Sequence, residues 1–195
     1  MRRAAWIAAA VALVAVLAIG LTQAGQDDPS PAPASAGSFD LDESLQSLEG
    51  APPPLAALHD RANEIIGADA DAYFSELARL KGHPVVVNAW ASWCGPCKLE
   101  FPVFQRVSTE LGKEVAFLGL NVSDNRQDAE AYLKKTPVPY PHLEDKDSRI
   151  VQRAGARGGL PTTIYYDKDG ERSFIHQGGY TEDADLIEDI RKYAG

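Results

Sequence analysis

The sequence has few of the residues that build metal centres. Its 195 residues include two cysteines, one methionine and four histidines. A structural zinc site usually takes four Cys or His ligands from paired motifs. The histidines show no ligand spacing, and they are His59, His83, His142 and His176. We therefore expect no metal and no cofactor, and one cysteine pair, Cys94 and Cys97, remains to be explained.

The chain also lacks a basic patch. Its formal charge is −9, from 28 acidic and 19 basic residues. Arg2 and Arg3 are the only cations of the first 25 residues, so the rest of the chain is more acidic still, at −11. This charge disfavours nucleic acids and anionic membrane surfaces as partners.

One long apolar run stands at the N-terminus. Residues 4–21 carry no charge and follow Arg2 and Arg3. About 20 apolar residues are needed to span a bilayer core, and cleaved signals usually have shorter apolar regions. We interpret residues 1–25 as an uncleaved signal anchor, with cleavage after Ala24 as the alternative. The arginines before the span place the rest of the chain outside the cytoplasm, tethered to the cell membrane by one N-terminal span.

The middle of the chain predicts a tether and then a domain. Residues 26–38 are rich in Pro, Ala and Ser and have no hydrophobic pattern. We take residues 26–54 as a tether and pre-domain segment, in which Leu41, Leu45 and Leu48 have helical spacing, and residues 55–195 as the folded domain.

Strand and helix patterns alternate along the domain. They predict helices at 55–66, 70–80, 96–111, 127–135 and 148–154, a last helix capped by Thr181, and strands at 85–90, 115–122, 138–144, 160–166 and 171–177. Such alternation indicates an α/β fold whose mostly parallel sheet is covered on both faces, with an antiparallel hairpin at one edge. Trp90 and Phe101 are expected in the core. Tyr165 and Tyr166 alternate along a strand, so we expect one inside and one outside.

The cysteine pair favours redox chemistry. A thiolate can attack a substrate disulfide, and a second thiol can then resolve the mixed disulfide. Cys94 falls between a predicted strand and a predicted helix, where free N–H groups and the helix dipole favour a thiolate. Cys97 lies one turn further in, and Pro96 suits a first helical turn. Two other interpretations of the pair remain: it could carry Cu(I), since thiolates bind copper, or it could form an inert structural disulfide.

The stretch from Val85 to Lys98 resembles the active site of the thioredoxin family, whose signature is the Trp93-to-Cys97 sequence WCGPC. The later Leu160-Pro161-Thr162-Thr163 resembles the family's cis-proline loop. The resemblance implies a thioredoxin fold, a mixed β-sheet flanked by helices. It also implies a Cys94–Cys97 disulfide, a cis Pro161 that faces Cys94 and helps to bind substrate backbone, and supporting roles for Trp93, Gly95, Pro96 and Leu160.

The segment 122–157 resembles the extra helix and strand that TlpA/ResA-type exported thioredoxins insert before the cis-proline loop. The pattern C-x-x-C-x-x-E-F-P of that branch runs here from Cys94 to Pro102 and places Glu100 on the helix face of Cys97. The resemblance implies a membrane-tethered thiol–disulfide oxidoreductase with Glu100 as a third catalytic residue. Its partners would be protein disulfides, including apocytochrome c, and a membrane thiol-electron donor. We expect a reductase; an oxidase and a copper metallochaperone are the alternatives.

Overall fold

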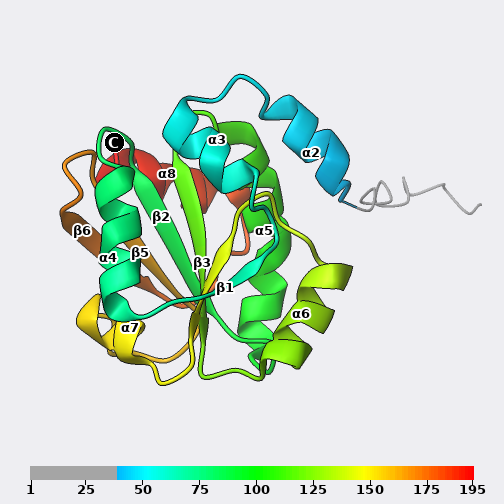
Figure 1. Cartoon of the computed structure of the whole chain (residues 1–195), viewed down its shortest axis with the longest axis vertical. Helices are drawn as coiled ribbons and strands as arrows, with labels where there is room; N and C mark the ends of the chain where they lie inside the picture. Colours follow the sequence, from blue (N-terminus) through cyan, green and yellow to red (C-terminus); the bar gives the residue numbers. More distant parts are fainter. Residues whose placement is uncertain (1–38) are drawn as a thin grey trace, which may run out of the picture. The chain divides into compact units, whose positions relative to one another are not determined.

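The computed structural model describes residues 39–195. The anchor predicted at 4–21 and the first part of the predicted tether, 26–38, lie outside the described residues. No helix within residues 39–195 is long and apolar enough to cross a membrane. The described residues form one compact unit, Phe39–Gly195, in which an α/β sheet is flanked by helices (Figure 1).

Six strands form a single mixed sheet. They are β1 (Ile65–Gly67), β2 (Val85–Trp90), β3 (Ala116–Val122), β4 (His142–Asp145), β5 (Thr162–Tyr166) and β6 (Arg172–Gln177), in the order β1-β4-β3-β2-β5-β6. The first four positions in this order pair in parallel, and β5 and β6 are antiparallel additions. The predicted mixed sheet with an antiparallel hairpin at one edge is confirmed.

Seven helices accompany the sheet in the described part of the chain. They are α2 (Leu41–Ser47), α3 (Pro53–His59), α4 (Ala70–Arg79), α5 (Gly95–Leu111), α6 (Arg126–Lys135), α7 (Arg149–Arg153) and α8 (Asp183–Tyr193). Short polar side chains explain several of the helix starts. Asp40, Asp69 and Asn125 each accept hydrogen bonds from N–H groups of the first turn, which would otherwise be unpaired.

Apolar side chains fill both faces of the sheet. Helices α5, α6 and α8 cover one face over Val86, Trp90 and Phe117. Helices α3, α4 and α7 cover the other face over Val87, Leu118 and Ile164. Because side chains alternate along a strand, each central strand contributes side chains to both cores.

The helices on both faces of the sheet explain why the expectation for Tyr165 and Tyr166 was wrong. Tyr165 and Tyr166 do point to opposite sides of β5, but both are buried, one in each core. The expectation that one faces solvent was wrong because helices cover both faces of this strand. Trp90 and Phe101 are buried as predicted.

Two element boundaries also differ from the sequence prediction. The predicted helix 55–66 ends at His59, and its last residues form β1, which pairs with β4. Ile65 and Ile66 are compatible with a helix or a strand, and they form a strand here because they pair with the edge of β4. The last helix is capped at Glu182 rather than Thr181, with no side-chain cap bond.

The segment before residue 55 contributes to the compact unit. Ser44 of α2 hydrogen-bonds Thr109 of α5 through the two hydroxyl groups, at 2.6 Å. Leu48, just after α2, is buried. The part of the predicted pre-domain segment that the structure describes is therefore folded onto the domain. The predicted inserted helix and strand are present as α6 and β4.

Candidate active site

The cysteine pair sits where β2 passes into α5. Ser92, just after β2, is held by Asp124, whose carboxylate accepts from the Ser92 backbone N–H and from its hydroxyl. Cys94 is the N-cap residue of α5, and its Sγ accepts the N–H of Cys97 at 3.2 Å. The two cysteines form a disulfide. The sheet end and the helix start thus fix Cys94 at the positive end of the helix dipole.

The two sulfurs differ in access. Cys94 retains 4% exposure, whereas Cys97 is 0% exposed. Gly95 and Pro96 lie between them in the first turn of α5. Of the two cysteines, only Cys94 therefore keeps any exposed surface.

The loop before β5 meets the start of α5. The Leu160–Pro161 peptide bond is cis, as the resemblance implied. A Cβ built on Gly179 would lie 3.5 Å from Cγ of Pro161, 3.5 Å from the carbonyl oxygen of Pro96 and 3.6 Å from Oε2 of Glu100. The cis-proline loop, the first turn of α5 and Glu100 therefore converge at Gly179, although they are far apart in sequence.

Glu100 is a buried carboxyl group rather than a solvated helix residue. Its exposure is 0%, and its Oε1 accepts from Nδ2 of Asn88 at 2.6 Å. Its Oε2 accepts from the backbone N–H of Tyr180 at 3.4 Å. Burial raises the pKa of Glu100 to about 8, and these two hydrogen bonds offset part of the rise. Glu100 therefore exchanges a proton near neutral pH.

Aromatic residues enclose the side of α5 that carries Glu100. Trp90 packs edge-on against Phe101, and its indole N–H donates to Nδ1 of His142 at 3.0 Å. Burial lowers the pKa of His142 to about 3, so the imidazole is neutral. Burial, followed by the charge of Glu100, raises the pKa of Tyr140. The carboxyl group of Glu100 thus lies beside an apolar, water-poor core.

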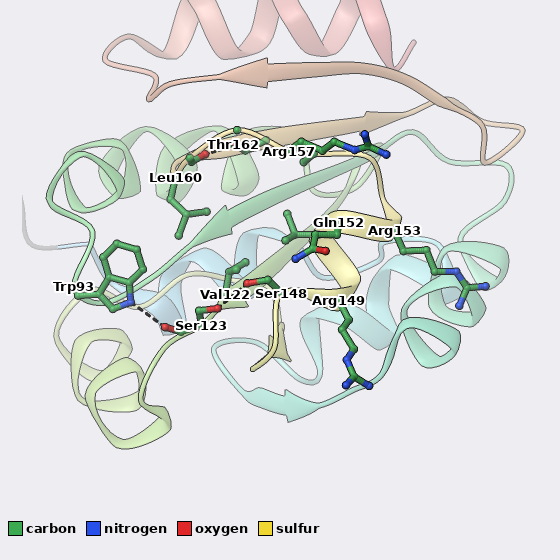
Figure 2. Close-up of a pocket in the computed structure, with 14 residues that line it drawn as sticks. Trp93, Val122, Ser123, Ser148, Arg149, Gln152, Arg153, Arg157, Leu160 and Thr162 are labelled. Atoms are coloured by element: carbon green, nitrogen blue, oxygen red, sulfur yellow. Dashed lines mark hydrogen bonds between the residues drawn. The ribbon is translucent and has the colours of Figure 1, made fainter.

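Trp93 marks the exposed rim of the site. Its side chain is 63% exposed, and its indole N–H donates to the carbonyl oxygen of Ser123 at 3.1 Å. Figure 2 shows Trp93 on one side of a surface cavity of about 830 Å³ and Leu160 beside it. The cavity therefore starts at the residues next to Cys94 and Pro161.

The structure brings the predicted site residues together and adds others. Asn88, Asp124 and Tyr180 hold the predicted residues in place from other elements. Of these three, only Asn88 carried a signal in the sequence: the resemblance to thioredoxins implies that it stands where the cytoplasmic members carry a buried aspartate. No group of three or more His, Cys, Asp or Glu side chains within residues 39–195 is arranged to hold a metal ion.

Comparison with known proteins agrees with this geometry. A family model described as the AhpC/TSA family matches residues 58–171. The thiol-disulfide oxidoreductase ResA of Halalkalibacterium halodurans is 28% identical over 66% of this chain and 73% of its own. The thiol:disulfide interchange protein DsbE of Xylella fastidiosa is 30% identical over 74% of this chain and 69% of its own. A solved structure, a putative DsbE from Chlorobium tepidum, superposes with a TM-score of 0.53 at 25% identity, over 60% of this chain and 82% of its own.

Proposed function

Because the chain belongs to the AhpC/TSA family, with relatives of the ResA and DsbE type, we propose that it is an extracytoplasmic, membrane-tethered reductase of protein disulfides. The chain is a thiol–disulfide oxidoreductase with a thioredoxin-like fold. The observation that carries the proposal is the Cys94–Cys97 disulfide at the start of α5, in which only Cys94 keeps any exposed surface.

The reaction follows from this difference in access. In the reduced protein the Cys94 thiolate attacks one sulfur of a substrate disulfide, and the other substrate sulfur leaves as a thiolate and takes up a proton. The Cys97 thiol then loses its proton and attacks Sγ of Cys94, which releases the second substrate thiol. The substrate gains two electrons, and the protein is left with the disulfide seen in the structure.

Glu100 supplies the group that this last step needs. It lies one turn after Cys97 on α5 and shares its burial. A pKa of about 8 lets the carboxylate take the Cys97 proton and return it at neutral pH. Glu100 therefore acts as general base in the proposed mechanism.

The direction of electron flow is part of the proposal. Gly95 and Pro96 between the cysteines are those of thioredoxin, whose potential is about −270 mV, against about −120 mV for the oxidant DsbA. Disulfides persist outside the cytoplasm, so a reductase there needs a dedicated thiol donor. A membrane thiol-electron donor would fill this role, and the predicted anchor at 4–21 would hold the domain beside it. Substrates would include exported disulfides such as those of C-x-x-C-H haem-attachment sites in apocytochrome c.

Trapping experiments test the chemistry. Cys97→Ser should accumulate mixed disulfides with substrate proteins, because the resolving thiol is missing, whereas Cys94→Ser should accumulate none. The purified reduced protein should also reduce insulin disulfides. Trapping by Cys94→Ser alone would reverse the two roles. Stoichiometric copper binding without insulin reduction would support a metallochaperone instead.

The direction and the location need separate measurements. Equilibration in glutathione buffers, followed by tryptophan fluorescence, should give a reduction potential closer to that of thioredoxin than to that of DsbA. A value near that of DsbA would support an oxidase. A C-terminal reporter that works only in the cytoplasm should stay inactive, and an active reporter would contradict the proposed topology.

A further inference from the structure

The cavity beside Trp93 has a charge opposite to that of the chain. Three of its lining residues are arginines and none is an aspartate or glutamate. They are Arg149, Arg153 and Arg157. Since the chain carries a net charge of −9, a basic lining here is a local feature rather than a consequence of composition.

The cavity is graded from apolar to basic. Figure 2 shows Trp93 and Leu160 at one end and Val122 and Gln152 further along; the side chains of Arg149, Arg153 and Arg157 lie apart around the far side and point away from one another. The apolar end adjoins Cys94 and Pro161 in the sequence. A chain that leaves a disulfide bound at Cys94 therefore meets apolar side chains first and positive charge later.

The walls of the cavity are fixed by hydrogen bonds. Trp93 is held on Ser123, whose hydroxyl pairs with that of Ser148 at 2.6 Å. The buried carboxylate of Asp145 accepts the N–H groups of Ile150 and Val151 and so fixes the first turn of α7. The cavity is therefore formed before any ligand binds, which lowers the entropy cost of binding.

The cavity also has room for a polypeptide. A Cβ built on Gly159 would meet no atom within 4 Å, so this part of the wall borders open space. The exposed Gln152 adds to the wall an amide side chain, which can both donate and accept hydrogen bonds. An extended chain needs both the space and such polar groups along its backbone.

The three arginines differ in how strongly they are engaged with neighbouring carboxylates. Arg157 makes no ion pair within residues 39–195. Arg149 is 83% exposed, and its Nε lies 4.0 Å from Asp147. Arg153 is the most engaged, since it pairs with Asp71 at 2.6 Å. Exposed ion pairs contribute only about 0–1 kcal/mol, so a substrate carboxylate can replace these partners at little cost.

We propose that this cavity binds an extended segment of the substrate protein that is apolar next to the reactive cysteine and acidic several residues away. The inference rests on the proposed function, because it names the substrate class of the same site. Charge complementarity between Arg149, Arg153 and Arg157 and the acidic residues would select the partner and speed its encounter.

Matched peptides test the inference. Each short peptide has one cysteine joined by a disulfide to a chromogenic thiol, apolar residues beside it, and three Glu, three Gln or three Lys further along, on either side of the cysteine. Reduction by the dithiol form yields the peptide thiol, the chromogenic thiol and the Cys94–Cys97 disulfide. We expect kcat/KM for the Glu peptide to exceed that for the Lys peptide about tenfold at low salt, and the ratio to shrink at high salt.

Two variants assign the preference to the cavity. Arg149→Gln combined with Arg157→Gln should bring the Glu-to-Lys ratio close to one. Lys134→Gln combined with Lys135→Gln removes the same charge from the exposed end of α6 and should leave the ratio as in the wild type. An equal shift in both double variants would assign the preference to overall charge and overturn the inference.

The same assay separates the two proposals. If the wild type reduces insulin, and reduces the Glu, Gln and Lys peptides at rates equal to one another, the acidic-segment inference fails and the proposed reductase stands. If it reduces neither insulin nor any peptide, the proposed function itself fails.

Discussion

The two faces of the sheet differ in how they treat polar groups. On the face covered by α3, α4 and α7, the strand residues are almost all aliphatic, and the buried hydroxyls of Tyr73 and Tyr166 pair with each other at 2.9 Å. The face covered by α5, α6 and α8 carries Asn88, His142 and Thr163 on its strands and Glu100 on α5. Within residues 39–195, the buried side-chain atoms without a hydrogen-bond partner are Asn88 Oδ1, Tyr140 Oη, His142 Nε2 and Thr163 Oγ1, and all of them lie on this second face.

The two faces differ in the free-energy cost of their buried polar atoms. Buried polar atoms without partners cost free energy, typically about 1–3 kcal/mol each. The aliphatic face avoids this cost, whereas the active-site face carries it around Glu100, the carboxyl group of the proposed mechanism. The sheet thus joins a stabilising side to a reactive side, and substitutions on the two sides should have different consequences.

The largest expected effect on stability comes from the aliphatic face. Leu118→Ala removes a fully buried side chain of β3 and leaves a cavity between the sheet and its helices. The free energy of unfolding should fall by about 2–5 kcal/mol. Denaturant unfolding measures this loss. Insulin reduction per folded molecule should stay as in the wild type, and a lower rate would show that the two faces are coupled.

Glu100→Gln should have a smaller effect that depends on pH. The pKa of Glu100 rises from 4.5 to about 8 on folding, so the folded state favours the protonated form. The stability from this group is fully present below pH 4.5 and is lost progressively as pH rises to about 8. The variant should lack this loss and become more stable than the wild type at alkaline pH, while its insulin reduction slows.

A matched control lies on the same helix. Glu110 is exposed near the end of α5, so Glu110→Gln should change neither the pH dependence of unfolding nor the rate. Denaturant unfolding from pH 4 to pH 9 compares the three proteins. A wild-type profile parallel to that of Glu100→Gln would contradict the buried, protonated carboxyl group.

The smallest expected effect contrasts two neighbouring threonines. Thr163→Val removes a buried hydroxyl without a partner on the active-site face and should stabilise the protein by about 1 kcal/mol. The hydroxyl of Thr162 donates to the carbonyl oxygen of Gly159 at 2.7 Å and accepts from Gln177 at 3.0 Å. Thr162→Val should therefore destabilise by about 1 kcal/mol. Changes of the same sign in thermal unfolding would contradict the assignment of the unpaired group.

The sequence predicted much of the fold because local patterns were strong. Apolar runs with β-branched residues marked β2 and β3, and Asp69 marked the start of α4. The cysteine pair and Pro161 came from a motif, and the structure places them together. The strand β1 was missed because Ile65 and Ile66 carry no local preference that excludes a helix.

Other features of the site had no local signal. The burial of Glu100 depends on the Tyr180 segment and on Asn88, which lie 80 and 12 residues away in the chain. The basic cavity arises because α7 and the loop that follows it lie near Trp93, and no local pattern in the sequence marks Arg149, Arg153 and Arg157.

The sequence by itself determined the redox pair, its place before a helix, and the alternation of strands and helices, because these depend on neighbouring residues. Tertiary structure decided which carboxyl group is buried and which surface beside Cys94 is basic. Burial and local charge depend on residues that fold together from distant segments, and a pKa such as that of Glu100 follows from that surrounding rather than from the residue type.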